Sequence, residues 1–287
     1  MRAAVLYAPF DIRFEEVDDP KIIEPTDAII RNSATCICGS DLWPYRGIGV
    51  RALPTPMGHE YCGIVEEVGS AVISVKPGQF VIGSFGASDN TCANCQAGYQ
   101  TSCRQVQFFT TAQAPLLRVP LADGTLVATP SVPSDDMIPD LLACSDVLGT
   151  GWFAADAANV KPGSTAVIVG DGAVGILAVL SAKLMGAERI VAMSRHESRQ
   201  KLAREFGATD IVTERGDEGV AQIKEMTDGI GADSVLECVG TQAAMMQAMR
   251  STRPGGYMSF VGVPHGVELD GEELFYSHVH LHGGPAP

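Results

Sequence analysis

The pattern of apolar and polar positions changes character near the middle of the chain. The first half contains short alternating runs broken by Gly and Pro, at residues 2–8, 11–17, 27–35, 61–69 and 79–86. Alternation with a period of two, bounded by turn residues, is typical of half-buried strands. Residues 1–147 are therefore predicted to form a mostly β domain.

From about residue 160, apolar runs alternate with longer helical stretches. Strands are predicted at 164–170, 189–194, 210–212, 232–240 and 256–263, with helices over 173–187, 197–208, 218–229 and 242–253 between them. Residues 279–284 are a candidate sixth strand. This order predicts a parallel sheet with helices on both faces, an α/β domain over 148–287. The two halves meet near residues 148–164.

Composition narrows the classes of function. The 287 residues are 46% apolar, enough for one large or two medium domains. A formal net charge of −14 disfavours nucleic acid as a partner. The N-terminus does not read as a signal peptide, and no apolar run is long enough to predict a membrane span. Eight cysteines without such a signal fit a reducing compartment, so a cytoplasmic location is expected.

A glycine-rich motif opens the first helix of the α/β half. The stretch VGDGAVG contains Gly170, Gly172 and Gly175 as GxGxxG, directly after a predicted strand. Such glycines permit a tight turn, close approach to a pyrophosphate and close helix packing. The helix start, at Ala173 and Val174, offers free N–H groups to phosphates. The context predicts a dinucleotide site.

The end of the next strand bears on which cofactor binds. NAD sites usually place Asp or Glu there to bind the ribose 2′-OH. Here Ser194 and Arg195 occupy that place, and His196 and Arg199 are near in sequence. An arginine would bind a 2′-phosphate that an acidic residue would repel. NADP(H) is therefore predicted over NAD(H), unless the two arginines are only solvated residues at a helix start.

Candidate metal ligands occur in the β half. CICGSD holds Cys36 and Cys38, and GHEYCGIVEEVGSAV holds His59 and Glu60. Asp146 precedes the junction between the halves. Zinc accepts sulfur, nitrogen and oxygen ligands, and catalytic zinc sites use three protein ligands and keep one position open.

These motifs together resemble the zinc-dependent alcohol dehydrogenase family of medium-chain dehydrogenases/reductases. GHEYCGIVEEVGSAV agrees with that family's zinc signature at every fixed position, CICGSD with its first ligand motif and VGDGAVG with its cofactor turn. The resemblance covers the whole chain. It implies a GroES-like catalytic domain followed by a Rossmann domain, and reversible hydride transfer between a nicotinamide cofactor and a small alcohol, aldehyde or ketone.

The resemblance also assigns roles around the catalytic zinc. Cys38, His59 and Asp146 would be ligands, with Glu60 as the neighbouring carboxylate. Ser40 stands at the family's proton-carrying hydroxyl, and Asp41 where a carboxylate orients the histidine. Thr150 matches a residue lining the nicotinamide side. Many members have cysteine at the third ligand position, so Cys144 is a rival to Asp146. Trp43 stands where some members continue the proton relay with histidine, and with Tyr45 it is expected to shape an apolar pocket.

A second cysteine cluster, at about residues 86–105, resembles the family's structural zinc lobe. Cys92, Cys95 and Cys103 keep its spacing, with Asp89 in place of its first cysteine. Aspartate can bind zinc, so a closed structural site is expected. A metal-free loop with three thiols and a thiol-exchange CxxC are the alternatives.

Several expectations rest on the resemblance alone. Family members continue some tens of residues past the final strand, so the Rossmann domain is expected to be incomplete at its C-terminus. A homodimer or homotetramer is expected. The alternatives are an NAD-dependent enzyme similar to formaldehyde dehydrogenase and a non-catalytic, cofactor-binding relative.

Overall fold

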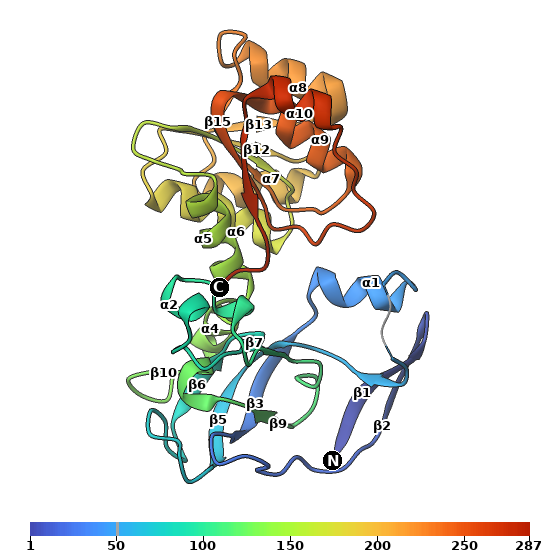
Figure 1. The fold of residues 1–287 in the computed structure, drawn as a ribbon, viewed down its shortest axis with the longest axis vertical. Helices are drawn as coiled ribbons and strands as arrows, with labels where there is room; N and C mark the ends of the chain where they lie inside the picture. The colour runs from blue at the N-terminus through green and yellow to red at the C-terminus, as the bar shows by residue number, and fades with distance from the viewer. Residues whose placement is uncertain (50–51) are drawn as a thin grey trace. The chain divides into compact units, whose positions relative to one another are not determined.

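A computed structural model describes residues 1–49 and 52–287 (Figure 1). The chain divides into two compact units, Met1–Asp146 and Val147–Ala286. The boundary therefore lies one residue before the one expected from the sequence, after residue 147. Each unit is considered by itself below.

The first unit is built mainly of short strands. They are β1 (Arg2–Ala8), β2 (Asp11–Glu16), β3 (Ala28–Cys36), β4 (Thr55–Pro56), β5 (Glu60–Val68), β6 (Phe80–Gly83), β7 (Gly86–Ala87), β8 (Gln107–Phe108), β9 (Leu116–Val119) and β10 (Leu126–Ala128). Short helical turns connect them: η1 (Gly39–Asp41), α1 (Leu42–Tyr45), α2 (Ala93–Gln96), η2 (Gln100–Ser102), α3 (Ala122–Thr125), η3 (Asp135–Met137) and α4 (Ile138–Ala143). The mostly β prediction is confirmed.

The central sheet of this unit brings the two halves of the candidate metal site together. Among the described residues its strand order is β10-β6-β5-β3-β9, and all neighbouring pairs are antiparallel. Cys36 at the end of β3 pairs with Glu60 at the start of β5. The turn that follows β3 therefore lies beside the residues that precede β5. Apolar side chains such as Ile30, Tyr61 and Leu117 fill the core against this sheet.

The second unit contains the predicted parallel sheet. Its strands are β11 (Thr165–Val169), β12 (Arg189–Met193), β13 (Asp210–Val212), β14 (Ala232–Glu237), β15 (Thr252–Phe260) and β16 (His280–Gly283). Its helices are α5 (Val147–Ala157), α6 (Ala173–Leu184), α7 (Glu197–Phe206), α8 (Gly216–Glu225), α9 (Gln242–Ser251) and α10 (Gly271–Ser277). Within the described part of the chain the order is β13-β12-β11-β14-β15-β16, every neighbouring pair parallel. The candidate strand at 279–284 is thus confirmed.

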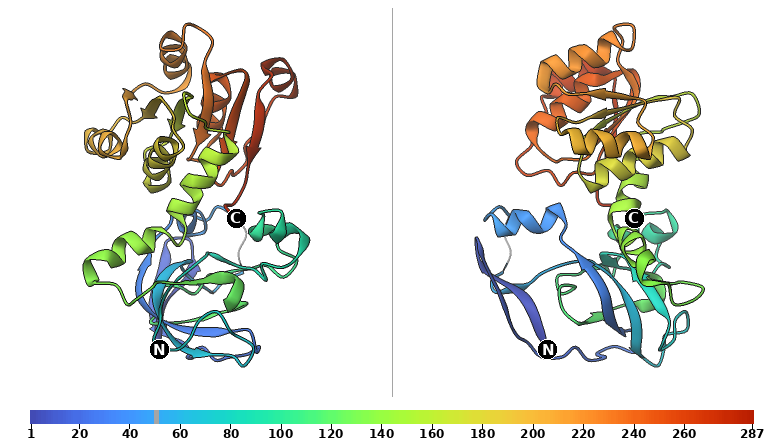
Figure 2. Two further views of the ribbon diagram at one scale, coloured as in Figure 1. Left: turned by 90° about the vertical axis from the view of Figure 1, so that its left-hand side faces the viewer. Right: turned by 180° about the vertical axis from the view of Figure 1, so that it is seen from behind.

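Helices cover both faces of this sheet (Figure 2). Alternate residues of β11 explain why. Ala166 and Ile168 pack in one apolar cluster with side chains of α5, α6 and α7, whereas Val167 and Val169 pack in another with side chains of α8 and α9. A strand buried on both faces reads as a continuous apolar run, as TAVIV does here. The doubly wound fold class is confirmed.

Three local expectations were incomplete or wrong. The junction region contains an eleven-residue helix, α5, which its two glycines and its lack of amphipathic periodicity concealed. The helix expected to end at residue 253 ends at Ser251, and β15 begins at Thr252. Pro254 explains this, because a residue before proline is disfavoured in helical conformation. Helix α10 was not expected, although Asp270 caps it by accepting a hydrogen bond from the Glu273 N–H.

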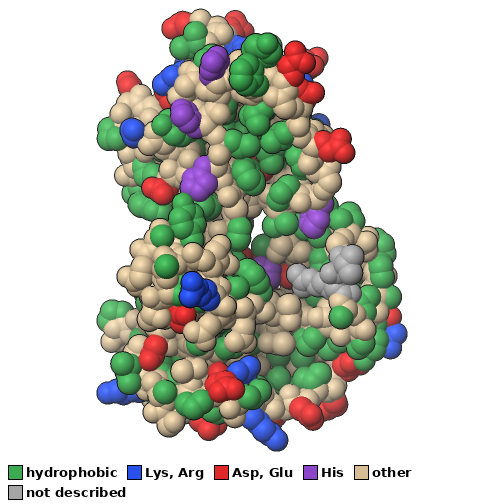
Figure 3. All heavy atoms as spheres, in the orientation of Figure 1, with side chains coloured by type: hydrophobic (Ala, Val, Ile, Leu, Met, Phe, Trp, Pro, Cys, Tyr) green, Lys and Arg blue, Asp and Glu red, His purple; other side chains and the backbone are tan. Residues whose placement is uncertain are grey.

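Charged side chains are dispersed on the face shown in Figure 3. Lys and Arg lie scattered among acidic and apolar residues there rather than gathered in one patch. No helix among residues 1–49 and 52–287 has both the length and the apolar character needed to cross a bilayer.

Candidate active site

The turn after β3 holds Cys38 and Asp41 in fixed positions. Cys38 has extended backbone and is followed by η1. The Cys38 N–H donates a hydrogen bond of 3.0 Å to Asp41 Oδ2. Asp41 is only 2% exposed. The carboxylate therefore both fixes the turn and presents its other oxygen to the interior.

That other oxygen faces His59. Asp41 Oδ1 lies 3.2 Å from His59 Nδ1, and Asp146 Oδ2 lies 3.2 Å from His59 Nε2. Ser40 Oγ is 3.4 Å from Nε2. A carboxylate on one ring nitrogen fixes the tautomer and orientation of a histidine that binds metal through the other. This geometry leaves Nε2 as the candidate ligand atom.

Three further potential ligand atoms gather with the His59 ring. Atoms of Cys38, His59, Glu60 and Asp146 all lie within 4.8 Å of one another. Cys144 is not in this group; it is exposed, and its Sγ contacts the Asp140 carbonyl at 3.5 Å. The structure thus places Asp146, rather than its rival, beside Cys38 and His59.

The donor set and its burial fit a zinc ion. One thiol, one imidazole nitrogen and carboxylate oxygens are ligands that zinc accepts. Glu60 is 1% exposed, and its Oε1 has no hydrogen-bond partner among the described residues. A buried carboxylate oxygen without a partner is costly, and a nearby cation would compensate for it.

The electrostatics of the site follow from these acidic neighbours. Burial by itself would lower the pKa of His59, but hydrogen bonds with Asp146 and Asp41 raise it to about 12. Burial, together with the charge of Asp146, raises the pKa of Glu60 to about 7. The site therefore favours a cation, either a proton on His59 or a metal ion that replaces it.

The candidate ligands of the second cysteine cluster also lie close together in the structure. Ligand atoms of Asp89, Cys92, Cys95 and Cys103 lie within 4.8 Å of one another. Cys92 Sγ is 3.5 Å from Cys95 Sγ, and Cys95 Sγ is 3.5 Å from Asp89 Oδ1. Zn–S bonds of about 2.3 Å in a tetrahedron place two sulfurs roughly 3.8 Å apart. The lobe is thus close to the geometry of a four-ligand zinc site.

The glycine-rich turn joins β11 to α6. Gly170 has φ +122°, a backbone conformation that favours glycine. A Cβ on Gly175 would collide with the Gly170 carbonyl oxygen, so no larger residue fits at position 175. A Cβ on Gly172 would meet no atom within 4 Å, which leaves open space at the helix start. Ala173 and Val174 form the first turn of α6. This open cradle fits the pyrophosphate of a dinucleotide.

The other predicted cofactor residues differ in exposure. Ser194 is 1% exposed, whereas Arg195 and Arg199 are exposed. Arg199 Nη1 is 2.8 Å from Asp171 Oδ1, and Ser194 Oγ donates to Asp171 Oδ2 at 2.8 Å. Thr150 is buried on α5. Sequence reasoning missed Asp171 because it stands at a variable position of the glycine motif, where only three-dimensional proximity reveals its partners.

Sequence reasoning also missed Phe85. Its ring lies 6.3 Å from that of His59 in an edge arrangement and stacks 6.3 Å from Phe108. Phe85 lies within the alternating run 79–86, but a local pattern does not reveal its contact with His59, which is more than 20 residues earlier in the chain. It adds an apolar surface beside the candidate metal ligands.

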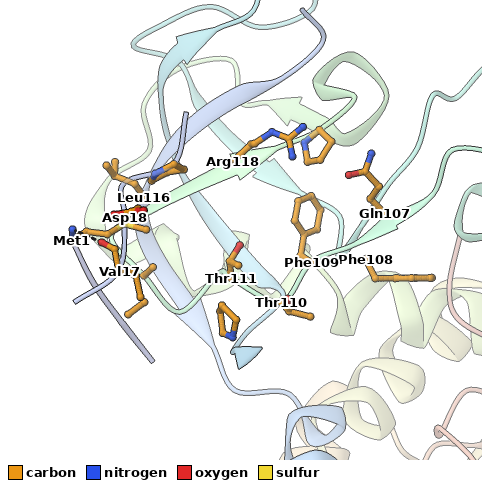
Figure 4. Close-up of a pocket in the computed structure, with 15 residues that line it drawn as sticks. Met1, Val17, Asp18, Gln107, Phe108, Phe109, Thr110, Thr111, Leu116 and Arg118 are labelled. Atoms are coloured by element: carbon orange, nitrogen blue, oxygen red, sulfur yellow. Dashed lines mark hydrogen bonds between the residues drawn. The ribbon is translucent and has the colours of Figure 1, made fainter. Parts of the chain in front are cut away.

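A pocket of about 360 Å³ in the first unit is a separate feature (Figure 4). Met1, Val17, Phe109, Leu116 and Arg118 are among its lining residues. It contains none of the four candidate catalytic ligands, and Arg118 is already paired with the buried Asp27. It is therefore not the candidate active site.

The chain is similar to known proteins in both of its units. Two family models match it: the alcohol dehydrogenase GroES-like domain over residues 24–140, and the zinc-binding dehydrogenase over residues 173–284. Both units are thus those of a zinc-type dehydrogenase. The chain belongs to the zinc-dependent alcohol dehydrogenase family of medium-chain dehydrogenases/reductases.

Individual relatives agree with this assignment. A zinc-type alcohol dehydrogenase B of Aspergillus flavus is 34% identical, with 100% of this chain and 69% of that protein covered. A medium chain reductase/dehydrogenase of Acremonium is 35% identical, with 92% and 94% covered. The solved structure of zinc dependent alcohol dehydrogenase 2 from Streptococcus pneumonia has a TM-score of 0.90 at 32% identity and covers 100% of this chain and 83% of its own. The protein is therefore an oxidoreductase of the zinc-type alcohol dehydrogenase class, with zinc and a nicotinamide cofactor implied.

Proposed function

We propose that the protein transfers hydride reversibly between NADP(H) and a small alcohol, aldehyde or ketone, with catalytic zinc held by Cys38, His59 and Asp146. The convergence of these ligand atoms with Glu60 within 4.8 Å carries the proposal. Zinc in such a site acts as a Lewis acid toward the substrate oxygen. The cofactor supplies the hydride chemistry, and the protein positions it.

Other side chains would orient the histidine, transfer the proton and shape the substrate pocket. Asp41 orients His59 through Nδ1, at 3.2 Å. Ser40, whose Oγ is 3.4 Å from His59 Nε2, would take the substrate's hydroxyl proton and pass it on. Trp43 lies where some family members continue the relay with histidine, so the proton would leave through the cofactor ribose and water or by another route. Trp43 and Tyr45 would shape an apolar pocket.

The preference for NADP(H) is the finer part of the proposal. It is supported by exposed Arg195 and by Ser194, in place of an acidic residue, at the end of β12. An arginine fork binds a phosphate through charge-assisted hydrogen bonds. The proposal also includes a structural zinc ion bound by Asp89, Cys92, Cys95 and Cys103. It further includes assembly as a homodimer or homotetramer and a cytoplasmic location.

The proposal is tested by a screen of NADPH and NADH oxidation over aldehydes and ketones, with zinc-loaded protein. We expect turnover with NADPH at a kcat/KM about tenfold or more above that with NADH, since 1.4 kcal/mol of phosphate recognition is sufficient for that ratio. Activity should disappear on chelation and return with zinc. Full activity of metal-stripped protein would refute the zinc mechanism, and a tenfold preference for NADH would refute the cofactor assignment.

A further inference from the structure

Asp171 connects three parts of the candidate cofactor site. It follows Gly170 in the glycine-rich turn, and its side chain is 9% exposed. One carboxylate oxygen accepts the hydroxyl hydrogen of Ser194 at 2.8 Å, and the other forms an ion pair with Arg199 at 2.8 Å. The turn, the end of β12 and the start of α7 are therefore joined through one acidic side chain.

The Asp171 carboxylate lies at the edge of the sheet where dinucleotide folds bind the adenosine ribose. In the parallel pair, Val169 of β11 is opposite Met193 of β12. Asp171 and Ser194 thus leave neighbouring strand ends at the same, carboxyl edge of the sheet. In dinucleotide folds this edge holds the adenosine ribose, whose 2′-OH is usually bound by an acidic residue from the second strand end. Here the second strand supplies Ser194, and the acidic group reaches the same place from the glycine turn.

The charged side chains near Ser194 have opposite effects on the binding of a 2′-phosphate. Arg199 is already compensated by Asp171, so its charge contributes little attraction toward a further anion. Arg195 is exposed, and among residues 1–49 and 52–287 it lies within ion-pair distance of no carboxylate. Arg195 therefore attracts a 2′-phosphate, whereas Asp171 repels one and can accept a hydrogen bond from a 2′-OH.

We infer that Asp171 is a cofactor-specificity residue that lowers the ratio of NADP⁺ to NAD⁺ affinity set by Arg195. The inference rests on the proposed use of a nicotinamide dinucleotide in this site. It implies that the enzyme accepts both cofactors. Two residues would determine the choice between NADP⁺ and NAD⁺. Arg195 at the strand end favours NADP⁺, and Asp171 in the glycine turn favours NAD⁺.

The test measures binding rather than turnover. Dissociation constants of NADP⁺ and NAD⁺ are determined by calorimetry for the zinc-loaded wild type, Asp171→Asn and Asp210→Asn. Asparagine keeps the shape of Asp171 and an oxygen that can accept from Ser194 or Arg199, so it removes chiefly the charge. Asp210 is the matched control because it also pairs with an arginine, Arg189, but at the opposite, amino end of β12.

We expect Asp171→Asn to raise the NADP⁺ to NAD⁺ affinity ratio about tenfold, as loss of one unit charge near a phosphate can, and Asp210→Asn to leave it unchanged. An unchanged ratio in Asp171→Asn, or an equal rise in Asp210→Asn, overturns the inference. If Asp171→Asn does not fold by circular dichroism, Asp171→Ser removes the same charge and is judged by the same ratio.

Arg195→Ala separates this inference from the proposed function. If Arg195→Ala leaves NADP⁺ affinity unchanged, the proposed NADP(H) preference is wrong. A rise in the ratio for Asp171→Asn relative to wild type still supports the role of Asp171 in that case, because the comparison holds whichever cofactor the wild type prefers. If Arg195→Ala weakens NADP⁺ binding and Asp171→Asn shifts nothing, the preference stands and the inference fails.

Discussion

At the scale of single residues, the proposed third zinc ligand is a choice between Asp146 and Cys144. Asp146 Oδ2 lies 3.2 Å from His59 Nε2, whereas Cys144 is exposed and contacts a backbone carbonyl. Asp146→Ala should lower bound zinc by one ion per chain and reduce kcat/KM by at least about 100-fold, because even residues that only support a ligand contribute 10–100-fold to affinity or activity. Zinc per chain by elemental analysis and initial rates measure both effects.

Two further variants make this prediction specific. Cys144→Ala should keep its zinc and its activity, whereas Asp146→Cys, which supplies a thiolate at the same position, should retain zinc. Loss of zinc in Cys144→Ala with none lost in Asp146→Ala would reverse the assignment.

The functional roles of residues could be predicted from the sequence only where the residues belong to a motif. The resemblance to the family's motifs suggested Cys38, His59 and the lobe cysteines as candidate ligands, and the structure brings the members of each of the two groups within 4.8 Å of one another. Asp171 and Phe85 were missed for a physical reason. Their significance depends on neighbours more than 20 residues away, Ser194 and His59 respectively, and no local pattern reports such proximity.

At the scale of elements, the carboxyl end of β14 contains a buried acid. Glu237 is 0% exposed; its Oε1 accepts from the N–H groups of Val239 and Gly240, and Oε2 has no partner among the described residues. Burial raises the pKa of Glu237 from 4.5 to about 7, although those two hydrogen bonds oppose the shift. The folded chain therefore keeps this proton at pH values where the unfolded chain has lost it.

This shift predicts a pH dependence of stability. As pH rises from 4.5 to about 7, the contribution of Glu237 to the free energy of unfolding should fall, by up to about 3 kcal/mol, and stay level above that range. Glu237→Gln cannot ionise and keeps an acceptor for the two N–H groups. Urea unfolding should show the variant gaining stability relative to wild type between pH 5 and 7.5. Parallel pH curves for the two proteins would contradict the shift.

Elements were predicted best where their pattern was strong. The strands of the α/β unit were found because they are buried on both faces and read as apolar runs, as β11 does. Helix α5 was missed because two glycines and a mostly apolar sequence give it no clear amphipathic signal. The boundary between α9 and β15 was misplaced because helical propensity continues to Arg253, while Pro254 acts on the conformation before it.

At the scale of the whole molecule, metal and cofactor residues fall in different compact units. The proposed ligands of the catalytic and lobe zinc ions all lie in Met1–Asp146, and the glycine turn lies in Val147–Ala286. Each unit has its own apolar core. Damage to one site should therefore leave the other unit folded and able to bind.

His59→Ala tests this separation. The variant should lose the catalytic zinc, keep the lobe zinc, and lose activity, since it removes a ligand and leaves Asp41 without its partner. Its NADP⁺ dissociation constant should stay within about twofold of wild type, a difference below about 0.4 kcal/mol. Zinc per chain, NADPH-dependent rates and calorimetry on the same preparation measure all three. A large loss of cofactor affinity would mean that the metal site organises the cofactor turn, in which case the two units could not be treated as independent binding modules.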